Sequence, residues 1–443
     1  MERLGIEHVD KERRHGRPFS TFTLWFGANL TIADFALGSL LFGLPLSSIV
    51  IAVVIGNIAG GLLVGLMASM GPNFGYPQMM ISRTVMGSRG NIPFALANWV
   101  STVGWFTVNI VLGGYALQLA FGIPFYVAAG ILVIADVGLA IYGHDVIHLF
   151  ERIMSIVLGV MFAALAVIAY FRMGNSLAIY NSHSSFSIYF WALVLAAVFS
   201  YIMSWAPYAS DYSRYLPENT SKFKIITYTT AGGAIASAWA ELVGFFVYVG
   251  ANNPGLGAIA ALKLVSGPYA LLALLAVVLG VMAADALNLY TNSLSALVLY
   301  RKAGRMRTVL LAGIIGFLLA LVGSSNFSTF YQNFLLTLDY WITPWIGVMM
   351  GGILVCKIRP GVETVRGYIG VGLGSYLIGL LASLPFMNLE SYGIAYVGPV
   401  AASIGGADLS YFVAFMVALA AYVLLMRWLK EKREGRVPIK GPE

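Results

Sequence analysis

The chain has 443 residues, 59% of them hydrophobic and only 10% charged, and its mean hydropathy is +0.83. A water-soluble domain of this size is much less apolar, so the composition excludes one and predicts an all-α polytopic membrane protein. The net charge of +7 is explained by basic loops facing anionic lipid, and it does not indicate nucleic acid binding.

Twelve apolar segments follow one another along the chain, each close to the 20 or so residues that a membrane-spanning helix needs. Between them no loop is long enough to fold by itself, which predicts a single transmembrane domain over 22–427, with polar tails over 1–21 and 428–443. The predicted spans cover 22–45, 47–71, 92–121, 124–143, 146–171, 187–210, 225–251, 268–300, 307–324, 328–355, 367–387 and 408–427.

The basic residues predict the orientation of these spans, because Lys and Arg concentrate in short cytoplasmic loops. With both termini in the cytoplasm, only Arg172 and Lys263 of the 26 basic residues lie on the outer side. The polar, basic stretch before Phe22 shows no cleavable signal peptide. We therefore expect a multi-pass protein of the cell (inner or plasma) membrane with both ends in the cytoplasm.

The first span, FTLWFGANLTIADFALGSLLFG, carries a polar interruption. Gly27, Asn29 and Thr31 lie together, and Asp34 follows one turn later. Glycine weakens a helix, and Asn and Thr side chains offer the backbone other hydrogen-bond partners. We expect the helix to break here.

The sixth span contains a second interruption, at Ser204, Trp205 and Pro207. Proline has no backbone donor and clashes with the carbonyl four residues earlier, so it breaks a helix. Broken helices near the bilayer midplane mark the substrate and ion sites of secondary transporters. Breaks in spans one and six, five helices apart, predict two inverted five-helix repeats (about 22–171 and 187–355), with additional helices over 367–427.

Span three carries Asn98, Thr102, Trp105 and Asn109 at spacings that place all four on one helix face. An amide in hydrocarbon costs several kcal/mol, so Asn109 must meet protein, water or substrate. An interhelical hydrogen bond and a ligand contact are both open for each asparagine. Because an aromatic ring one turn from an amide suits a flat heterocycle, Trp105 favours the ligand.

Span eight repeats the pattern with Asp285, Asn288, Asn292 and Ser295. An ionisable residue in a span is a functional candidate, because burying its charge is costly. Asp285 is therefore a proton carrier, a cation ligand or a carboxyl kept neutral. Further acidic residues lie in or near apolar runs, where each either takes part in coupling or pairs with a neighbour: Asp34, Asp136, Glu241 and Asp339.

Seven motifs make the chain resemble the nucleobase-cation symporter family of cytosine, purine, allantoin and hydantoin permeases, most closely its cytosine-purine branch. They occur in the expected order over about residues 20–355: FGANLTIADFALGSLLFGL, GPNFGYPQMMISRTVMGSRGN, GWFTVN, SDYSRYLP, AELVG, NLYTNSLSAL and YWITP.

The resemblance implies a twelve-helix, five-plus-five transporter with discontinuous helices 1 and 6, which holds a flat substrate between spans one, three, six and eight and works by alternating access. It implies that Trp105 and Asn109 stack on and bond the substrate, that Trp205 lines the other face, and that Asn288 or Asn292 grips the ring edge. The full expected substrate set is Asn29, Thr31, Trp105, Asn109, Ser204, Trp205, Asn288 and Asn292.

The resemblance also implies a cation site, and the chain departs from it. Sodium-coupled members hold the ion between span-one carbonyls, here nearest Gly27 and Leu30, and two span-eight hydroxyls. In this chain the hydroxyl positions fall on Ala283 and Ala284 or on Ala286 and Leu287, which have no side-chain oxygen. Unless Asp285 or Asp34 substitutes, a sodium ion would lack ligands, so we expect proton coupling over sodium coupling. The expected cation-coupling residues are Gly27, Leu30, Asp34 and Asp285, with no metal and no cofactor.

The function predicted is secondary active uptake of a cytosine- or purine-type nucleobase, or a similar small planar heterocycle, by cation symport. Two alternatives are open: a related permease for allantoin, hydantoin, a thiamine precursor or a nucleoside, and a passive channel or facilitator. An enzyme is not expected, because the intramembrane segments lack a Ser-His-Asp set or metal-binding motif. The expected partners are the substrate and membrane lipid, with no nucleic acid and no obligate protein partner.

Overall fold

The computed structural model describes residues 5–142, 144–253, 256–358 and 368–434. Within these residues the regular structure is helical, apart from one isolated bridge between Asn388 and Val397. The all-α prediction is confirmed. The chain divides into two compact units, one of Met1–Gln78 with Ala95–Leu338 and the other of Met79–Phe94 with Asp339–Glu443.

The first predicted span is two helices, α1 (Phe19–Asn29) and α2 (Ile32–Leu40). Leu30 leaves the helical conformation with φ −84° and ψ 65°. The extended Thr31 then caps α2, because its side chain accepts a hydrogen bond from the Asp34 amide. The predicted break is confirmed and lies at Leu30 and Thr31.

The sixth span is also interrupted. Helix α10 (Ile188–Met203) ends before Ser204, a single 3₁₀ turn follows over Ala206–Tyr208, and α11 (Ala209–Ser213) continues the chain. Pro207 lies in the 3₁₀ turn, where its missing N–H and fixed φ disturb no regular helix. The break predicted at this proline is confirmed.

Every other predicted span falls on a described helix. Within the described part of the chain, eight helical stretches are long and apolar enough to cross a membrane, and two apolar helices are shorter. The count of twelve spans, the single domain and the inverted repeat stay predictions. These predicted spans fall on α3 (Leu46–Ala68), α6 (Ile92–Phe121), α7 (Phe125–Tyr142), α8 (His144–Met173), α12 (Lys222–Ala251), α14 (Ala270–Leu299), α15 (Arg305–Gly323), α16 (Phe327–Met349), α17 (Tyr368–Ser383) and α19 (Ser410–Glu434).

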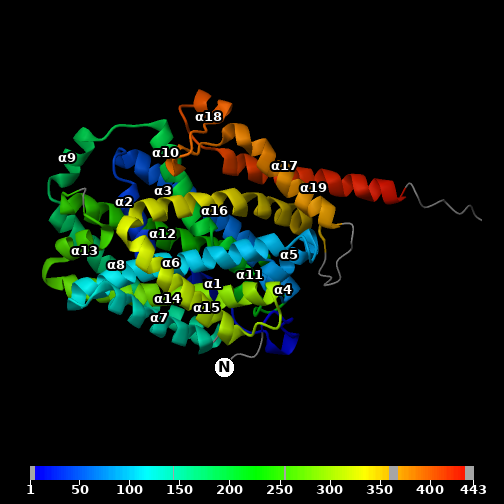
Figure 1. Ribbon diagram of the computed structural model, residues 1–443, viewed down its shortest axis with the longest axis horizontal. Coiled ribbons are helices and arrows are strands. Elements are labelled where there is room, and N and C mark those ends of the chain that lie inside the picture. Colours follow the sequence, from blue (N-terminus) through cyan, green and yellow to red (C-terminus); the bar gives the residue numbers. More distant parts are fainter. Residues whose placement is uncertain (1–4, 143, 254–255, 359–367, 435–443) are drawn as a thin grey trace, which may run out of the picture. The chain divides into compact units, whose positions relative to one another are not determined.

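Shorter helices join the spans: α4 (Gly71–Phe74), α5 (Gln78–Met86), α9 (Ser176–His183), α13 (Ala258–Ser266) and α18 (Pro399–Ser403). In the first unit the long helices α6, α12 and α14 run in roughly the same direction across Figure 1. Helix α12 packs against α1, α2, α3 and α8, while α14 packs against α7, α8 and α15. The second unit is built around the pairing of α17 with α19.

Glycines bring helix backbones together in the first unit. A Cβ built on Gly38 of α2 would lie 2.3 Å from the Glu241 carbonyl oxygen of α12, and one on Gly244 would lie 2.0 Å from that of Phe35. The two backbones touch here, so a methyl group has no room. This contact fixes α2, the second half of the broken span, against α12.

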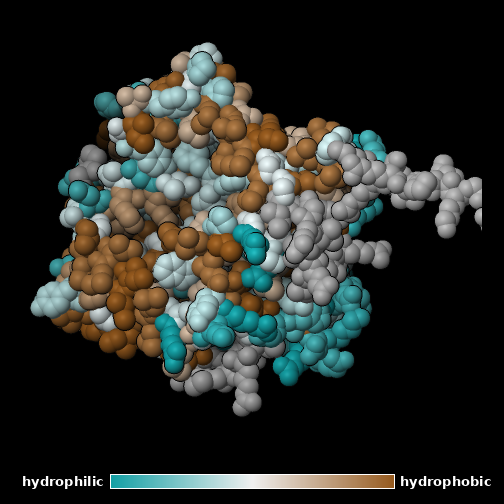
Figure 2. All heavy atoms as spheres, turned by 45° about the vertical axis from the view of Figure 1, so that its right-hand side comes forward, coloured by the Kyte–Doolittle hydropathy of each residue, from teal (hydrophilic) through white to brown (hydrophobic). Residues whose placement is uncertain are grey.

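The surface of the long helices is apolar, as the membrane assignment requires. On α7 and α8 the side chains of Ile134 and Phe171 are each 77% exposed. Figure 2 shows brown, hydrophobic side chains over large parts of one face. Exposed apolar surface of this extent is expected where lipid is the solvent.

Candidate functional site

The two broken spans bond to each other at their breaks. The Trp205 indole Nε1 donates to Asn29 Oδ1 at 2.9 Å, and Asn29 Nδ2 donates to the Trp25 carbonyl at 2.7 Å. One turn further, the hydroxyls of Thr31 and Tyr201 lie 2.8 Å apart. All these side chains are buried, so the polar side chains at the two breaks find hydrogen-bond partners inside the first unit.

Trp105 of α6 lies in an aromatic cage. Its ring meets Tyr201 and Phe334 edge-on, with centroids 5.2 Å apart in each case, and Tyr331 at 6.3 Å. The Trp105 Nε1 atom is buried and has no hydrogen-bond partner among the described residues. A buried indole donor normally finds an acceptor, so this atom marks a place for a ligand.

Asn109, one turn beyond Trp105, meets span eight. Its Nδ2 donates to Asp285 Oδ1 at 2.7 Å, and Asn288 Nδ2 reaches the same oxygen at 3.4 Å. Asn288 Oδ1 in turn accepts from the Tyr208 hydroxyl at 3.3 Å. The structure thus brings Asn109, Asp285 and Asn288 together, and Asn109 Oδ1 is left buried without a partner in the part of the chain described.

Asn292 and Ser204 lie apart from this group. Asn292 Nδ2 donates to Thr102 Oγ1 at 2.9 Å and to the Trp99 carbonyl at 3.1 Å, which joins α14 to α6. Ser204 Oγ donates to the Tyr201 carbonyl at 2.7 Å, within its own helix. Both residues therefore make structural bonds here, although Asn292 Oδ1 is also unpartnered. Their assignment to the substrate stays a prediction.

The predicted coupling carboxyls belong to two separate clusters. Asp34 interacts with Ser237 and Glu241 of α12, and Asn57 Nδ2 of α3 donates to Glu241 Oε2 at 2.7 Å. Asp285 interacts with Asp136 of α7. All four acids are fully buried. Because two neighbouring carboxylates cannot both be ionised cheaply away from water, each pair is suited to hold a proton.

The backbone at the first break faces two other helices. A Cβ built on Gly280 of α14 would lie 3.8 Å from the Leu30 carbonyl oxygen. On the other side, Gly27 packs against Glu151 of α8, a residue that sequence reasoning did not single out. It lies inside the predicted span 146–171 and within the apolar stretch of α8. An acid inside that run is the signal that could have found it.

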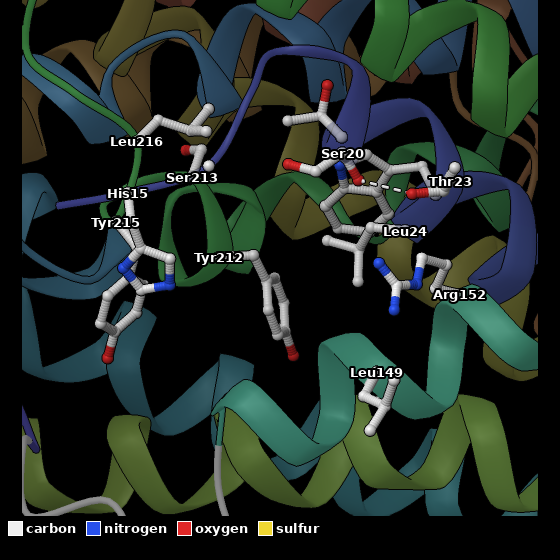
Figure 3. A pocket seen from close by; sticks show the side chains of 13 residues that line it. His15, Ser20, Thr23, Leu24, Leu149, Arg152, Tyr212, Ser213, Tyr215 and Leu216 are labelled. Carbon is white, nitrogen blue, oxygen red and sulfur yellow. Dashed lines mark hydrogen bonds between the residues drawn. The ribbon is translucent and has the colours of Figure 1, made fainter.

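Two cavities lie at opposite ends of the first broken span. One, of about 360 Å³, is shown in Figure 3, where Leu24, Leu149, Arg152 and Tyr212 surround the hollow. The other, of about 270 Å³, is lined by residues that include Gly43 just after α2, Tyr180 and Tyr248. Among the described residues no three His, Cys, Asp or Glu side chains gather as a metal site would require.

The family model described as "Permease for cytosine/purines, uracil, thiamine, allantoin" matches residues 8–414. The chain belongs to this family. The permease is thus a multi-pass membrane transporter of the nucleobase-cation symport family and not an enzyme, as predicted.

Similar proteins cover almost the whole permease. The Bacillus subtilis protein YxlA, which carries the name of a purine-cytosine permease, is 28% identical over 98% of both chains. The purine-cytosine permease fcyB of Emericella nidulans is 26% identical over 96% of this chain and 88% of its own.

The fold of the permease matches solved transporter structures. One is Mhp1, a nucleobase-cation-symport-1 family transporter, in a closed conformation with bromovinylhydantoin bound. It aligns with a TM-score of 0.79 and 19% identity, over 97% of this chain and 96% of Mhp1. Its inward-facing conformation aligns at 0.76 with 17% identity over the same shares. At these identities the likeness establishes the transporter fold.

Proposed function

We propose that the permease takes up a nucleobase, or a similar small planar heterocycle, by proton symport and alternating access. The observation that carries the proposal is that one unsatisfied donor, Trp105 Nε1, and one unsatisfied acceptor, Asn109 Oδ1, occur close together along α6. Both atoms are buried, neither has a partner in the described residues, and they lie one turn apart on the same face of α6.

A ring edge with an adjacent carbonyl and N–H is the complement of such a donor and acceptor. Cytosine, uracil, oxopurines and hydantoins all carry that edge. Aromatic side chains around Trp105, together with Trp205 at the second break, supply faces on which a flat ring stacks. Leaving both atoms unpaired is costly, so a ligand that satisfies them gains affinity and selectivity.

Proton coupling is favoured by what surrounds the first break. The Leu30 carbonyl faces Gly280, and the next turn of α14 carries Ala283 and Ala284, which add no side-chain oxygen. A hard cation takes several oxygen ligands. The nearest side-chain oxygens of α14 are those of Asp285, which is bonded to Asn109 and interacts with Asp136. Two buried carboxyl pairs, Asp34 with Glu241 and Asp136 with Asp285, instead offer places for a proton.

The two cavities support alternating access. In the orientation predicted from the basic loops, the cavity beside Arg152 opens toward the cytoplasm and the cavity beside Tyr180 opens outward. The proposed substrate site and both carboxyl pairs are buried in the same unit as these two hollows. A substrate entering from one hollow and leaving by the other would pass the breaks of both discontinuous helices.

The proposal is tested with the purified permease in vesicles carrying an imposed proton gradient, with and without sodium. The panel is cytosine, uracil, adenine, hypoxanthine, allantoin and hydantoin, followed by a thiamine precursor and a nucleoside. We expect uphill accumulation of one planar heterocycle driven by the proton gradient alone. Accumulation that requires sodium would contradict the coupling, and equilibration without accumulation would make the protein a facilitator.

A further inference from the structure

Glu151 is a buried acid that the proposed substrate site does not use. It lies on α8 with an exposed fraction of 0%. Neither carboxyl oxygen has a hydrogen-bond partner among the residues that the structure describes. An isolated carboxylate is strongly disfavoured away from water, so this arrangement suits the neutral, protonated acid.

The Glu151 carboxyl rests on the backbone of α1 at its last turn. A Cβ built on Gly27 would lie 2.7 Å from Glu151 Oε2 and 3.0 Å from the Glu151 carbonyl oxygen, and 3.6 Å from Ser155 Cβ. Only glycine leaves room for the acid at this point. Leu30, where α1 ends, is three residues further on. The acid is therefore in contact with the part of α1 that would move if the helix turned about its break.

No described charged group compensates Glu151 from the elements that pack against α8. Helix α1 carries no ionisable residue, and Lys263 of α13 donates to the Leu119 carbonyl. Glu241 of α12 interacts with Asp34 and Asn57. Asp136 of α7 interacts with Asp285 of α14. Arg152, the next residue on α8, is exposed and lines the cavity of Figure 3, as do His15, Tyr212 and Tyr215.

A cavity borders the same two helices as the acid. Thr23, Leu24 and Trp25 of α1, and Leu149 and Arg152 of α8, line the 360 Å³ cavity. The two helices that enclose Glu151 are thus the same two that form one wall of the cavity (Figure 3). Separation of the first half of α1 from α8 would extend the cavity to the carboxyl group.

We propose that Glu151 is a proton-dependent latch on α1. While α1 packs against α8, Glu151 holds its proton. When α1 separates, the O–H bond breaks, the proton passes to water in the cavity, and the carboxylate is stabilised by that water and by Arg152. Helix α1 returns only after the acid takes up a proton again. The proposal rests on the proposed proton symport. It adds that Glu151 exchanges a proton and that α1 is the helix whose movement depends on that exchange.

The first test compares Glu151→Gln with Glu218→Gln. The glutamine mimics the neutral acid, so we expect substrate binding and substrate exchange to persist while proton-driven accumulation falls at least tenfold and loses its pH dependence. Glu151→Asp keeps an acid and should restore accumulation with a shifted pH profile. Glu218 is an exposed control whose bond to Lys11, at 2.8 Å, lowers its pKa, and its replacement should change nothing. Full proton-driven accumulation by Glu151→Gln would overturn the latch.

A second measurement separates the latch from the transport proposal. Thr23→Cys in a Cys356→Ser background places a thiol on the α1 wall of the cavity. We expect the labelling rate of this thiol to depend on pH more steeply when Glu151 is present than in Glu151→Gln. The thiol itself is the same in both backgrounds, so its own ionisation contributes equally. This result supports the latch even if accumulation proves to need sodium, and identical pH profiles in the two backgrounds would exclude it.

Discussion

At the scale of single residues, the informative atoms are the buried ones without partners. Trp105 Nε1 and Asn109 Oδ1 are such atoms on one face of α6, and Asn98 further along that face spends its Nδ2 on Ser295 Oγ at 2.9 Å. Asn109 likewise donates its Nδ2 to Asp285 Oδ1 at 2.7 Å, and Asn98 Oδ1 is unpartnered too, so it is the neighbouring Trp105 Nε1 that favours Asn109 as the proposed ligand contact. Matched asparagine variants test that assignment.

Asn109→Ala should weaken substrate binding, and because it also removes the Nδ2 bond to Asp285 it should lower the thermal unfolding midpoint as Asn98→Ala does. The lost hydrogen bond is worth about 1.5 kcal/mol, or roughly a tenfold weaker Kd. Asn98→Ala is the control: it breaks a bond between α6 and α14 and should lower the thermal unfolding midpoint while affinity is kept. Titration calorimetry and thermal unfolding of both variants check this. Equal losses of affinity would contradict the assignment.

Asp285→Asn tests whether the carboxyl pair takes part in coupling. Asparagine still accepts the bond from Asn109 but has no proton to exchange with Asp136, so we expect the pH dependence of uptake to flatten. Initial uptake rates across a pH series measure the effect, and Asp408→Asn, in the second unit, serves as the control. An unchanged pH profile in Asp285→Asn would remove the residue from the coupling mechanism.

At the scale of elements, the two halves of the first broken span both pack against α12 and differ in other neighbours. Helix α2 touches α12 backbone to backbone at Gly38 and Gly244. Helix α1 meets α8 through the Glu151 carboxyl group and borders a cavity. Helix α1 also touches the α12 backbone, because a Cβ built on Gly232 would lie 2.4 Å from the Phe22 carbonyl oxygen. Both halves are therefore held against α12, and α1 differs from α2 in its contact with Glu151 and in the cavity beside it.

Gly38→Ala should destabilise the permease, because its methyl group would overlap the α12 backbone and force α2 away. The expected loss is about 1–3 kcal/mol, seen as a lower thermal unfolding midpoint. Gly138→Ala on α7 is the matched control, since a Cβ there meets nothing within 4 Å. It should be neutral or slightly stabilising, because alanine is the better helix former. Similar midpoints for the two variants would refute the α2–α12 contact.

At the scale of the whole molecule, the distribution of basic residues makes a prediction about orientation. Lys222 and Lys263 are both exposed and fall on opposite sides in the predicted topology. Each is replaced singly by cysteine in a Cys356→Ser background. A membrane-impermeant thiol reagent applied to intact cells should label Lys263→Cys and not Lys222→Cys, and inverted vesicles should give the opposite result. Labelling of both from the same side would refute the predicted orientation.

The sequence by itself determined the membrane class, the approximate positions of the long apolar helices and the two helix breaks. These properties are local: hydropathy, the missing donor of Pro207 and the cap formed by Thr31 act within a few residues. The face that carries Trp105 and Asn109 is local too, because helical periodicity sets it.

Only the tertiary structure decided which polar groups meet. Asn288 and Asn292 lie one turn apart on α14, yet the first joins Asp285 and Tyr208 while the second bonds Thr102. Glu151 became a candidate only when α1 placed Gly27 against it. Periodicity gives the face of a helix, but the rotation and depth of the neighbouring helix decide the partner, and both depend on packing contacts far apart in the chain.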